Sequence, residues 1–203
     1  MSTARATLRT TGVAIRAMLV FTLVLGVGYT LLITAIGQLA LPWQANGSLI
    51  TTSAGTATGS ALIGQSFVDA DGTPLPEYFQ SRPSAAGDGY DGGASSGSNL
   101  GPENADLIAS ISERRDAIAA FEGVDPAAVP PDALTASASG LDPDISPAYA
   151  RLQVERVAEA RGLPVAEVRD LVESRIQARD LGFLGEPRVN VLQLNLALDA
   201  LQG

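Results

Sequence analysis

One long apolar segment dominates the hydrophobic pattern of the chain. Residues 17–41 (AMLVFTLVLGVGYTLLITAIGQLAL) contain no Asp, Glu, Lys or Arg. As an α-helix this segment would be about 37 Å long, enough to cross a hydrocarbon core about 30 Å thick. Because a helix satisfies its own backbone hydrogen bonds in lipid, the pattern predicts one transmembrane helix over 17–41.

Two other interpretations of this segment are weaker. A cleaved signal peptide has a shorter apolar region, of about 7–15 residues, followed by a small-residue cleavage site. Here the apolar run is longer, and the Leu-Pro-Trp sequence at 41–43 is more typical of an anchor at the membrane interface. A buried helix of a soluble protein is rarely apolar on all sides over this length. We therefore expect a retained membrane anchor.

The rest of the chain contains an uncharged linker and two strand-like segments. Residues 42–60 are small and polar and are typical of a linker, and 61–203 form the predicted domain. Residues 61–68 and 188–194 have the composition or alternation of strands, with Gly64 as a candidate bulge. Because these two segments lie at opposite ends of the domain, they are candidates to pair in a small sheet.

Helices are predicted between the two strand candidates from their start and stop signals. The expected helices begin at Pro102-Glu103 and end at Gly123, run from Ser146-Pro147 to about Arg161, begin at Pro164, and occupy 195–201 near the end of the chain. The predicted fold class is therefore α+β, with one N-terminal transmembrane helix followed by an α+β domain that contains a small sheet.

The charge distribution gives the orientation of the predicted span. The tail over 1–16 contains Arg5, Arg9 and Arg16 and no acidic residue, whereas all 22 acidic residues and the other 10 of the 13 arginines follow the span. Arginines beside a span stay on the cytoplasmic side. We therefore predict a cytoplasmic tail over 1–16 and an extracytoplasmic domain with a net charge of −12.

Small residues recur at every fourth position within the span. They are Thr22, Gly26, Thr30 and Thr34. This spacing places them along one helical stripe, where another helix can approach closely. Membrane helices contain many small residues in any case, so the stripe is a candidate helix-packing face.

Composition removes most enzyme chemistries. The chain has no His, Cys or Lys, so it lacks the commonest general base, a thiol, a Schiff-base amine and a P-loop lysine. Ser137 and Ser139 are candidate nucleophiles with no His or Lys to activate them. Asp142 and Asp144 are a candidate hard-cation site, and they are equally good residues for the start of a helix. The acidic charge disfavours binding to nucleic acid.

Two further groups have open interpretations. Arg151, Arg156 and Arg161 suit either anion binding or a surface role, in which they are solvated or paired with Glu155 and Glu159 of the same predicted helix. The aromatic pair at 78–79 suits either a partner surface or the edge of the core.

Several motifs in a fixed order carry a resemblance to a known family. They are 62–67 (LIGQSF), 78–79 with 82–85 (YF and RPSA), 96–104 (SGSNLGPEN), 135–147 (TASASGLDPDISP), 156–162 (RVAEARG) and 184–191 with 194–199 (LGEPRVNV and LNLALD). In these motifs the chain resembles the KdpC family, the C subunit of Kdp-type potassium-transporting ATPases, over the span and essentially the whole outer domain. The motif residues taken as candidate site residues are Gln65, Phe67, Arg82, Pro83, Ser98, Asn99, Gly101, Pro102, Asn104, Ser137, Ser139, Gly140, Asp142, Pro143, Asn190 and Asn195.

The resemblance implies a non-catalytic accessory subunit of a high-affinity, ATP-driven potassium uptake complex in the bacterial cell membrane, needed for assembly or activity. Its implied partners are a potassium-channel-like subunit, a P-type ATPase subunit and membrane lipid. The complex would use ATP, Mg and K, and the chain itself would carry no cofactor, no metal and no catalytic residue. The family has been proposed to act as a catalytic chaperone that raises the ATP affinity of the ATPase subunit. The alternative from another class is a membrane-tethered solute-binding or hydrolase domain.

Overall fold

The computed structural model describes residues 2–51 and 55–202, with side chains from Thr7 onward. Residues 52–54 of the predicted linker, Gly203 at the end of the predicted domain, and the side chain of Arg5 lie outside this description. The chain divides into two compact units, 1–49 and 50–203.

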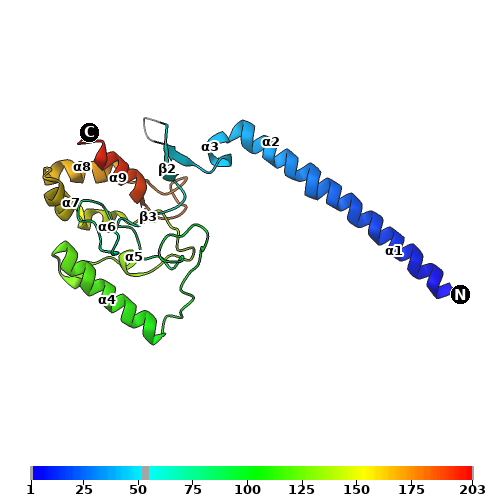
Figure 1. Cartoon of the computed structure of the whole chain (residues 1–203), viewed down its shortest axis with the longest axis horizontal. Helices are drawn as coiled ribbons and strands as arrows, with labels where there is room; N and C mark the ends of the chain where they lie inside the picture. Colours follow the sequence, from blue (N-terminus) through cyan, green and yellow to red (C-terminus); the bar gives the residue numbers. More distant parts are fainter. Residues whose placement is uncertain (1, 52–54, 203) are drawn as a thin grey trace. The chain divides into compact units, whose positions relative to one another are not determined.

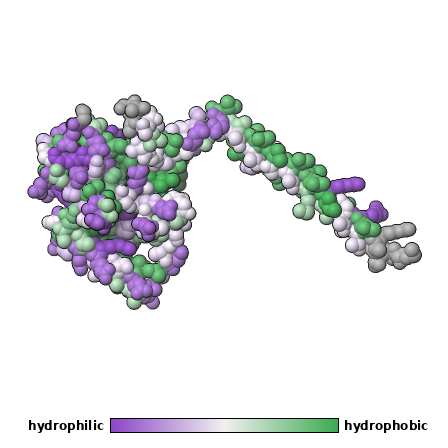
Figure 2. Space-filling model, viewed as in Figure 1, coloured by the Kyte–Doolittle hydropathy of each residue, from purple (hydrophilic) through white to green (hydrophobic). Residues whose placement is uncertain are grey.

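A continuous helix makes up most of the first unit (Figure 1). It consists of α1 (Ser2–Phe21), η1 (Thr22–Tyr29) and α2 (Thr30–Ala40). Within the described residues it is the one helix that is long and apolar enough to cross a membrane, with a candidate span of Thr7–Ala40. Its exposed apolar side chains form the hydrophobic surface seen along the helix in Figure 2. The predicted N-terminal helix is confirmed by length and composition, and the place where it enters the membrane stays a prediction.

The middle of this helix, η1, is a π-helix, in which backbone hydrogen bonds reach five residues back. The Thr30 hydroxyl also donates five residues back, to the carbonyl of Leu25 over 3.5 Å. Gly26 and Gly28 lie within η1, and a Cβ at Gly26 would meet only Thr22 Cγ2, at 3.8 Å. The helix itself therefore has room for a larger side chain at Gly26.

A short helix follows the long one. It is α3 (Pro42–Ala45), and Pro42 at its first turn cannot donate a backbone hydrogen bond to α2. The Trp43 indole donates to the carbonyl of Leu49 over 3.0 Å, and the Asn46 amide donates to Gln38 Oε1 over 3.1 Å. These bonds fix the turn at the end of the apolar helix.

The strands of the described residues are short and form two separate two-stranded sheets. One contains β1 (Leu49–Thr51) and β2 (Ala57–Ser60). The other contains β3 (Asp144–Ile145) and β4 (Val189–Asn190), which run antiparallel. With the helices described below, these strands confirm the predicted α+β class.

The strand predicted over 61–68 is wrong. This stretch is turn and irregular backbone, apart from one bridge between Val68 and Pro74. Its backbone groups bond to scattered partners instead of a neighbouring strand: the carbonyl of Gln65 accepts from the Ser81 hydroxyl over 2.8 Å, and the N–H of Gly64 donates to the carbonyl of Leu141 over 2.9 Å. The apolar composition of the segment therefore reflects loop packing and not a sheet.

The strand predicted over 188–194 is confined to β4. Asn190 ends it, because its Oδ1 accepts from the backbone N–H of Gln193 over 3.0 Å and caps α9 (Val191–Asp199). β4 pairs with β3, so the predicted pairing of the two ends of the domain is also wrong. The two ends meet through a side chain instead, since Asn190 Nδ2 donates to the carbonyl of Ala61 over 3.0 Å.

The first predicted helix of the domain is α4 (Ala105–Glu122). It begins later than Pro102, because Asn104 is the cap: its Oδ1 accepts two backbone N–H groups of the first turn, over 2.8 and 3.1 Å. It ends at Gly123, as predicted, with a φ of +67°.

The second predicted helix is split in two. Ser146 caps α6 (Pro147–Leu152), as predicted, but the helix breaks at Gln153 before α7 (Val154–Arg161) begins. Gly162 ends α7 with a φ of +64°. The other described helices of the domain are η2 (Pro126–Ala128), α5 (Pro131–Leu134) and α8 (Val165–Arg175).

The hydrophobic core lies among α6, α7, α8 and α9, which gather on one side of the domain in Figure 1. Its fully buried side chains include Val154, Val157, Val168, Val172, Leu194 and Leu198. Val168 and Val172 come from the helix predicted to begin at Pro164, whereas Val165 of the same helix is 39% exposed. A helical core of this kind leaves the long segment before α4 without a strand or helix to pair with.

Two buried amide side chains hold that segment in place. Asn195 in α9 accepts from the backbone N–H of Phe79 over 2.9 Å and donates to its carbonyl over 3.0 Å. Gln153, at the break between α6 and α7, does the same for Gln80, over 2.6 and 3.1 Å. Both amides are buried, and Phe79 is fully buried, so the partner-surface interpretation of the aromatic pair is wrong for Phe79.

The Gln80 side chain extends this arrangement to the preceding loop. Its Nε2 lies within hydrogen-bond distance of the carbonyls of Phe67, Leu75 and Tyr78, at 3.0, 3.0 and 3.3 Å. These carbonyls also accept from the backbone N–H of Leu75, the backbone N–H of Tyr78 and Arg156 Nη1, so the buried amide adds a second donor to each of them.

We expect Asn195→Ala to lower the free energy of unfolding by about 2–5 kcal/mol, because it leaves both backbone groups of Phe79 buried without partners. Gln193→Ala, on the same helix but without a side-chain bond to this segment, should change it by less than about 1 kcal/mol. Thermal unfolding of the full chain in mild detergent measures both. Equal midpoints for the two variants would contradict the importance of the buried amide.

Candidate functional site

The motif residues of the domain meet where the loop before α4 crosses residues 135–147. Two glycines allow the close contact. A Cβ at Gly64 would lie 2.4 Å from Tyr90 Cε1 and 2.7 Å from the carbonyl oxygen of Asp142. Gly140 has a φ of +67°, and a Cβ there would lie 2.6 Å from the carbonyl oxygen of Ser96. Gly64 is therefore a close-approach position and not the predicted bulge.

A serine side chain organises the turn next to this crossing. Ser84 donates from its hydroxyl to the carbonyl of Gly140 over 2.6 Å. The same oxygen accepts from the backbone N–H groups of Ala86 and Tyr90, over 3.1 and 2.9 Å. The hydroxyl therefore shapes the turn and ties it to the second motif.

Arg82 lies at the centre of the crossing. Its Nη1 donates to Asp142 Oδ2 over 2.7 Å, and its Nη2 to the carbonyl of Thr135 over 3.3 Å. The Tyr90 hydroxyl donates to the backbone carbonyl of Arg82 over 2.9 Å. Burial raises the pKa of Tyr90 to about 12, so the phenol stays a neutral donor at physiological pH.

The two aspartates of the candidate cation site are held by guanidinium groups. Besides its bond to Arg82, Asp142 accepts through Oδ1 from the backbone N–H of Asp144 over 3.0 Å. Asp144 Oδ2 lies 3.3 Å from Arg188 Nε. Burial is the main cause that raises the pKa of Asp144, and the negative charge of Asp142 raises it further. The described residues contain no group of three or more His, Cys, Asp or Glu side chains that could hold a metal. The arrangement gives no support to a cation site, and Asp144 begins β3 instead of a helix.

The candidate nucleophiles are part of the same loop packing. Ser139 Oγ accepts from the backbone N–H of Leu141 over 3.1 Å and lies 3.4 Å from Ser137 Oγ. The chain has no His or Lys, the usual activators of a serine. These serines therefore act as turn residues.

Two arginines of α7 fasten the loop over residues 76–80. Arg156 pairs with Glu122 Oε2 over 3.0 Å, donates to the carbonyl of Tyr78 over 3.1 Å, and lies 4.4 Å from the centre of the Phe121 ring. The side chains of this ion pair are only 8% and 1% exposed. Arg161 donates to the carbonyl of Glu77 over 2.7 Å. The predicted pairing with glutamates of the same helix is therefore wrong for Arg156 and Arg161, because their acidic partners, Glu122 and Asp199, come from distant segments.

The third arginine of the sequence prediction, Arg151, pairs with Glu173 over 2.6 Å at the surface. Both side chains are about half exposed, at 50% and 44%. Such a pair contributes little to stability.

A cleft of about 480 Å³ lies between Arg82 and α4 and is lined by residues of both segments. Its lining includes Pro74, Arg82, Arg114, Ile118, Phe121 and Tyr149. Arg114 donates to the carbonyl of Leu134 over 3.0 Å, and burial raises the pKa of Tyr149, which therefore stays neutral. The cleft offers apolar contact and guanidinium groups but no pair of nucleophile and base among the described side chains.

The remaining motif residues divide between structural contacts and an exposed loop. Gln65 donates to the carbonyl of Thr58 over 3.1 Å, the Phe67 ring lies 5.5 Å from that of Tyr78, and the Pro143 carbonyl accepts from the backbone of α9. The motif residues in the exposed loop before α4 are Ser98, Asn99, Gly101 and Pro102. Pro83 lines the cleft near Arg82. Of these residues, Phe67 and Pro83 line a small cleft together with Arg82, whereas residues 98–102 do not line it.

The stripe Thr22, Gly26, Thr30 and Thr34 lies on the long helix, where the Thr34 hydroxyl donates to the carbonyl of Thr30 over 2.8 Å. Sequence reasoning missed Gln80, Gln153 and Ser84 as organising residues. The sequence predicted one helix through Gln153, so nothing in it marked this residue as the break between α6 and α7.

An anchored α+β domain whose polar motif residues bind its own backbone is typical of a subunit or adaptor more than of an enzyme. Residues 11–200 match the family model described as "KdpC: K+-transporting ATPase, c chain". The chain therefore belongs to the KdpC family.

Curated relatives cover nearly the whole chain. A protein of Caulobacter vibrioides is 55% identical over 188 residues, which is 92% of this chain and 91% of the relative. One of Beijerinckia indica is 53% identical over 184 residues, with 91% and 90% covered, and one of Gemmatimonas aurantiaca is 57% identical over 180 residues, with 88% and 86% covered. Each of these relatives is named "Potassium-transporting ATPase KdpC subunit".

We expect Arg156→Met to destabilise the domain by about 3–5 kcal/mol at pH 8, because it leaves Glu122 buried without its ion pair. Burial already raises the Glu122 pKa above 4.5, and loss of Arg156 raises it further. A raised carboxyl pKa adds stability as the pH falls through that pKa, so the deficit should shrink between pH 8 and pH 5.

Thermal unfolding of the full chain in mild detergent at several pH values measures this dependence. Arg151→Met, which breaks the exposed pair with Glu173, is the matched control and should change the midpoint little. A deficit for Arg156→Met that stays constant from pH 8 to pH 5 would exclude the burial of Glu122 as its cause.

Proposed function

We propose that this chain is a non-catalytic accessory subunit of a high-affinity, ATP-driven potassium uptake complex in the bacterial cell membrane. Its proposed partners are a potassium-channel-like subunit and a P-type ATPase subunit, and the complex uses ATP, Mg and K. The observation that carries the proposal is the family match over 11–200 on a chain whose described residues include one apolar helix long enough to span a membrane.

The chemistry of the domain supports an accessory role. Its polar motif residues are engaged in bonds that hold its own loops, such as Arg82 with Asp142 and Asn195 with Phe79. Ser137 and Ser139 have no His or Lys to activate them. A membrane-tethered hydrolase, the alternative function, is therefore disfavoured, and catalysis is assigned to another subunit.

The proposed orientation places the N-terminus in the cytoplasm and the domain outside. Arg5, Arg9 and Arg16 precede the apolar run, and every acidic residue follows it. Arginine retention on the cytoplasmic side supports this single-pass arrangement.

Affinity purification tests the proposal directly. The tagged full chain, extracted in mild detergent from cells that make the whole transport system, should bring down two larger membrane proteins. Recovery of the chain alone from such cells would refute the proposed assembly.

We further propose that the stripe Thr22, Gly26, Thr30 and Thr34 is the face on which another helix of the complex packs. Gly26→Leu should weaken assembly, because its side chain would separate the two helix backbones. The helix itself accommodates a Cβ at this position, so a loss of assembly points to the partner.

Gly28→Leu is the matched control, since a Cβ at Gly28 also fits, 3.5 Å from the carbonyl oxygen of Leu23, and Gly28 is not on the stripe. Co-purification should fall for Gly26→Leu and stay near the unchanged level for Gly28→Leu. Equal retention of both variants would argue that assembly depends on the outer domain.

We propose that any effect on the ATP affinity of the ATPase subunit is indirect. In the proposed orientation the tail over 1–16 lies in the cytoplasm, and the domain lies across about 30 Å of hydrocarbon from the nucleotide. The domain also has no P-loop lysine, and its net negative charge repels ATP. A coupling free energy transmitted through the spanning helix is the remaining route.

Calorimetric titration of ATP into the purified full chain in detergent, at physiological salt, should therefore show no saturable micromolar binding. In the assembled complex, Gly26→Leu should raise the ATP concentration needed for half-maximal hydrolysis. Saturable binding to the isolated chain would replace the indirect route by a direct one.

A further inference from the structure

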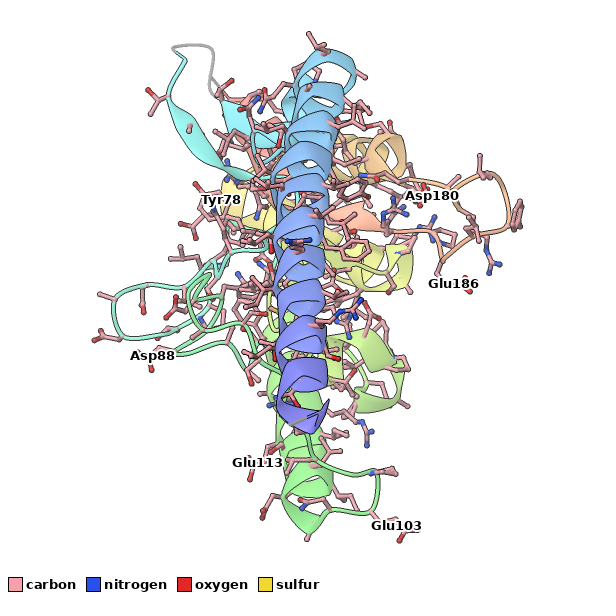
Figure 3. All side chains as sticks on the ribbon, turned by 90° about the vertical axis from the view of Figure 1, so that its right-hand side faces the viewer. Tyr78, Asp88, Glu103, Glu113, Asp180 and Glu186 are labelled. Carbon is pink, nitrogen blue, oxygen red and sulfur yellow. The ribbon has the colours of Figure 1, made fainter. Side chains whose placement is uncertain are left out.

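A tight hairpin over residues 177–188 stands between α8 and β4. Its base is closed by reciprocal backbone bonds between Gln177 and Arg188, of 2.8 and 3.0 Å. Nearer the tip, Asp180 and Leu184 exchange two bonds of 2.9 Å. Figure 3 shows the hairpin extending away from the body of the domain, with Asp180 and Glu186 on its two arms.

The tip of this 177–188 hairpin is apolar and exposed. Leu181, Phe183 and Leu184 are 82%, 69% and 50% exposed. Large apolar side chains that lie singly on a surface need no explanation, but three gathered at one projecting tip are typical of an interaction site.

The backbone conformation at the tip is unfavourable for a leucine. Leu181 has a φ of +54°, a region that bulky side chains rarely adopt and that Gly or Asn adopts more easily. Gly182, next to it, has a φ of +82°. A bulky apolar residue in this conformation points to a role for its side chain beyond the turn itself.

The arms of the hairpin are braced by ion pairs. Arg179 pairs with Glu186 across the two arms. Arg188 lies 3.4 Å from Asp180 and 3.3 Å from Asp144, so its guanidinium also connects the hairpin to β3. The two arginines and two acidic residues of the hairpin give it no net charge. The tip is therefore presented on a braced, neutral support.

We propose that the tip of the 177–188 hairpin inserts into a preformed apolar pocket on the extracytoplasmic surface of another protein subunit of the transport complex. This inference rests on the proposed function. A braced hairpin loses little conformational entropy on docking, which favours a fixed protein pocket. Because the hairpin is neutral, the pocket rim needs no compensating charge, and salt should affect docking little.

Lipid is a less suitable partner for this tip. The hairpin has no Trp or Tyr, the aromatic residues that typically anchor a protein at a membrane interface, and its two arginines are paired with Glu186 and Asp180. It places Asp180 directly before Leu181 and Glu186 two residues after Leu184, where anionic headgroups would repel them.

Photo-cross-linking in the assembled complex tests the partner. With a photoreactive amino acid in place of Phe183, the full chain should form a covalent adduct with another protein subunit. An adduct with lipid alone, with a second copy of this chain, or with nothing would overturn the proposal. If the chain co-purifies with its partners but gives no such adduct, the proposed function stands and the docking inference fails. If the chain does not co-purify with its partners at all, the proposed function is refuted, and the docking inference falls with it.

Substitution provides an independent test. Leu181→Asn removes the apolar side chain but suits the left-handed backbone, so the thermal midpoint of the isolated chain should not fall. Retention in the purified complex after washing should drop about tenfold, as for the loss of a central interface residue, and Phe183→Ser should behave alike.

Ile108→Asn is the matched control, because Ile108 is 55% exposed on α4, away from the hairpin in sequence. It should leave retention unchanged. Retention of Leu181→Asn and Phe183→Ser at the level of Ile108→Asn would overturn the proposal.

Discussion

The structure of the domain depends on hydrogen bonds between buried side-chain amides and an extended stretch of backbone. Phe79 and Gln80 pass through the interior without a strand beside them, so Asn195 and Gln153 take the part of a neighbouring strand. Unpaired backbone groups at these positions would be costly, because the interior offers no water to replace the missing partner. The helical core and the long irregular loop can coexist because each amide supplies one donor and one acceptor.

Guanidinium groups perform the same task nearer the surface. Arg156 and Arg161 reach from α7 to the carbonyls of the loop, and Arg82 connects two loops to each other. A planar group with five donors can bind a carboxylate and a carbonyl together, which a lysine ammonium does with less geometric control. All the basic residues of this chain are arginines, and their geometry gives a physical reason why they can hold its long loops.

Local signals in the sequence predicted what depends on local physics. The apolar run, the Ser146 cap and the glycine stops at 123 and 162 follow from chain composition within a few residues, and the structure agrees. The strand at 61–68 failed because an apolar loop held by distant side chains has the same composition as a strand. The partners of Arg156 and the role of Gln153 depend on contacts more than 30 residues away, which no short pattern contains. Of the candidate site, the motif positions were accessible from the sequence, but their mutual contacts were not.

The π-helical stretch changes the geometry of the small-residue stripe. In an α-helix, a step of four residues overshoots a full turn by about 40°, so a stripe with this spacing winds steadily around the helix. The π-helix η1 has more residues per turn than an α-helix, so four residues there rotate by less than a full turn. The stripe therefore drifts around η1 in the opposite direction. Thr22, Gly26 and Thr30 drift one way through η1, and the step from Thr30 to Thr34 in α2 reverses that drift. The four small residues therefore lie in a nearly straight line along the helix. A second helix that packs on this line crosses at a shallow angle and contacts the stripe over its whole length, not at one point.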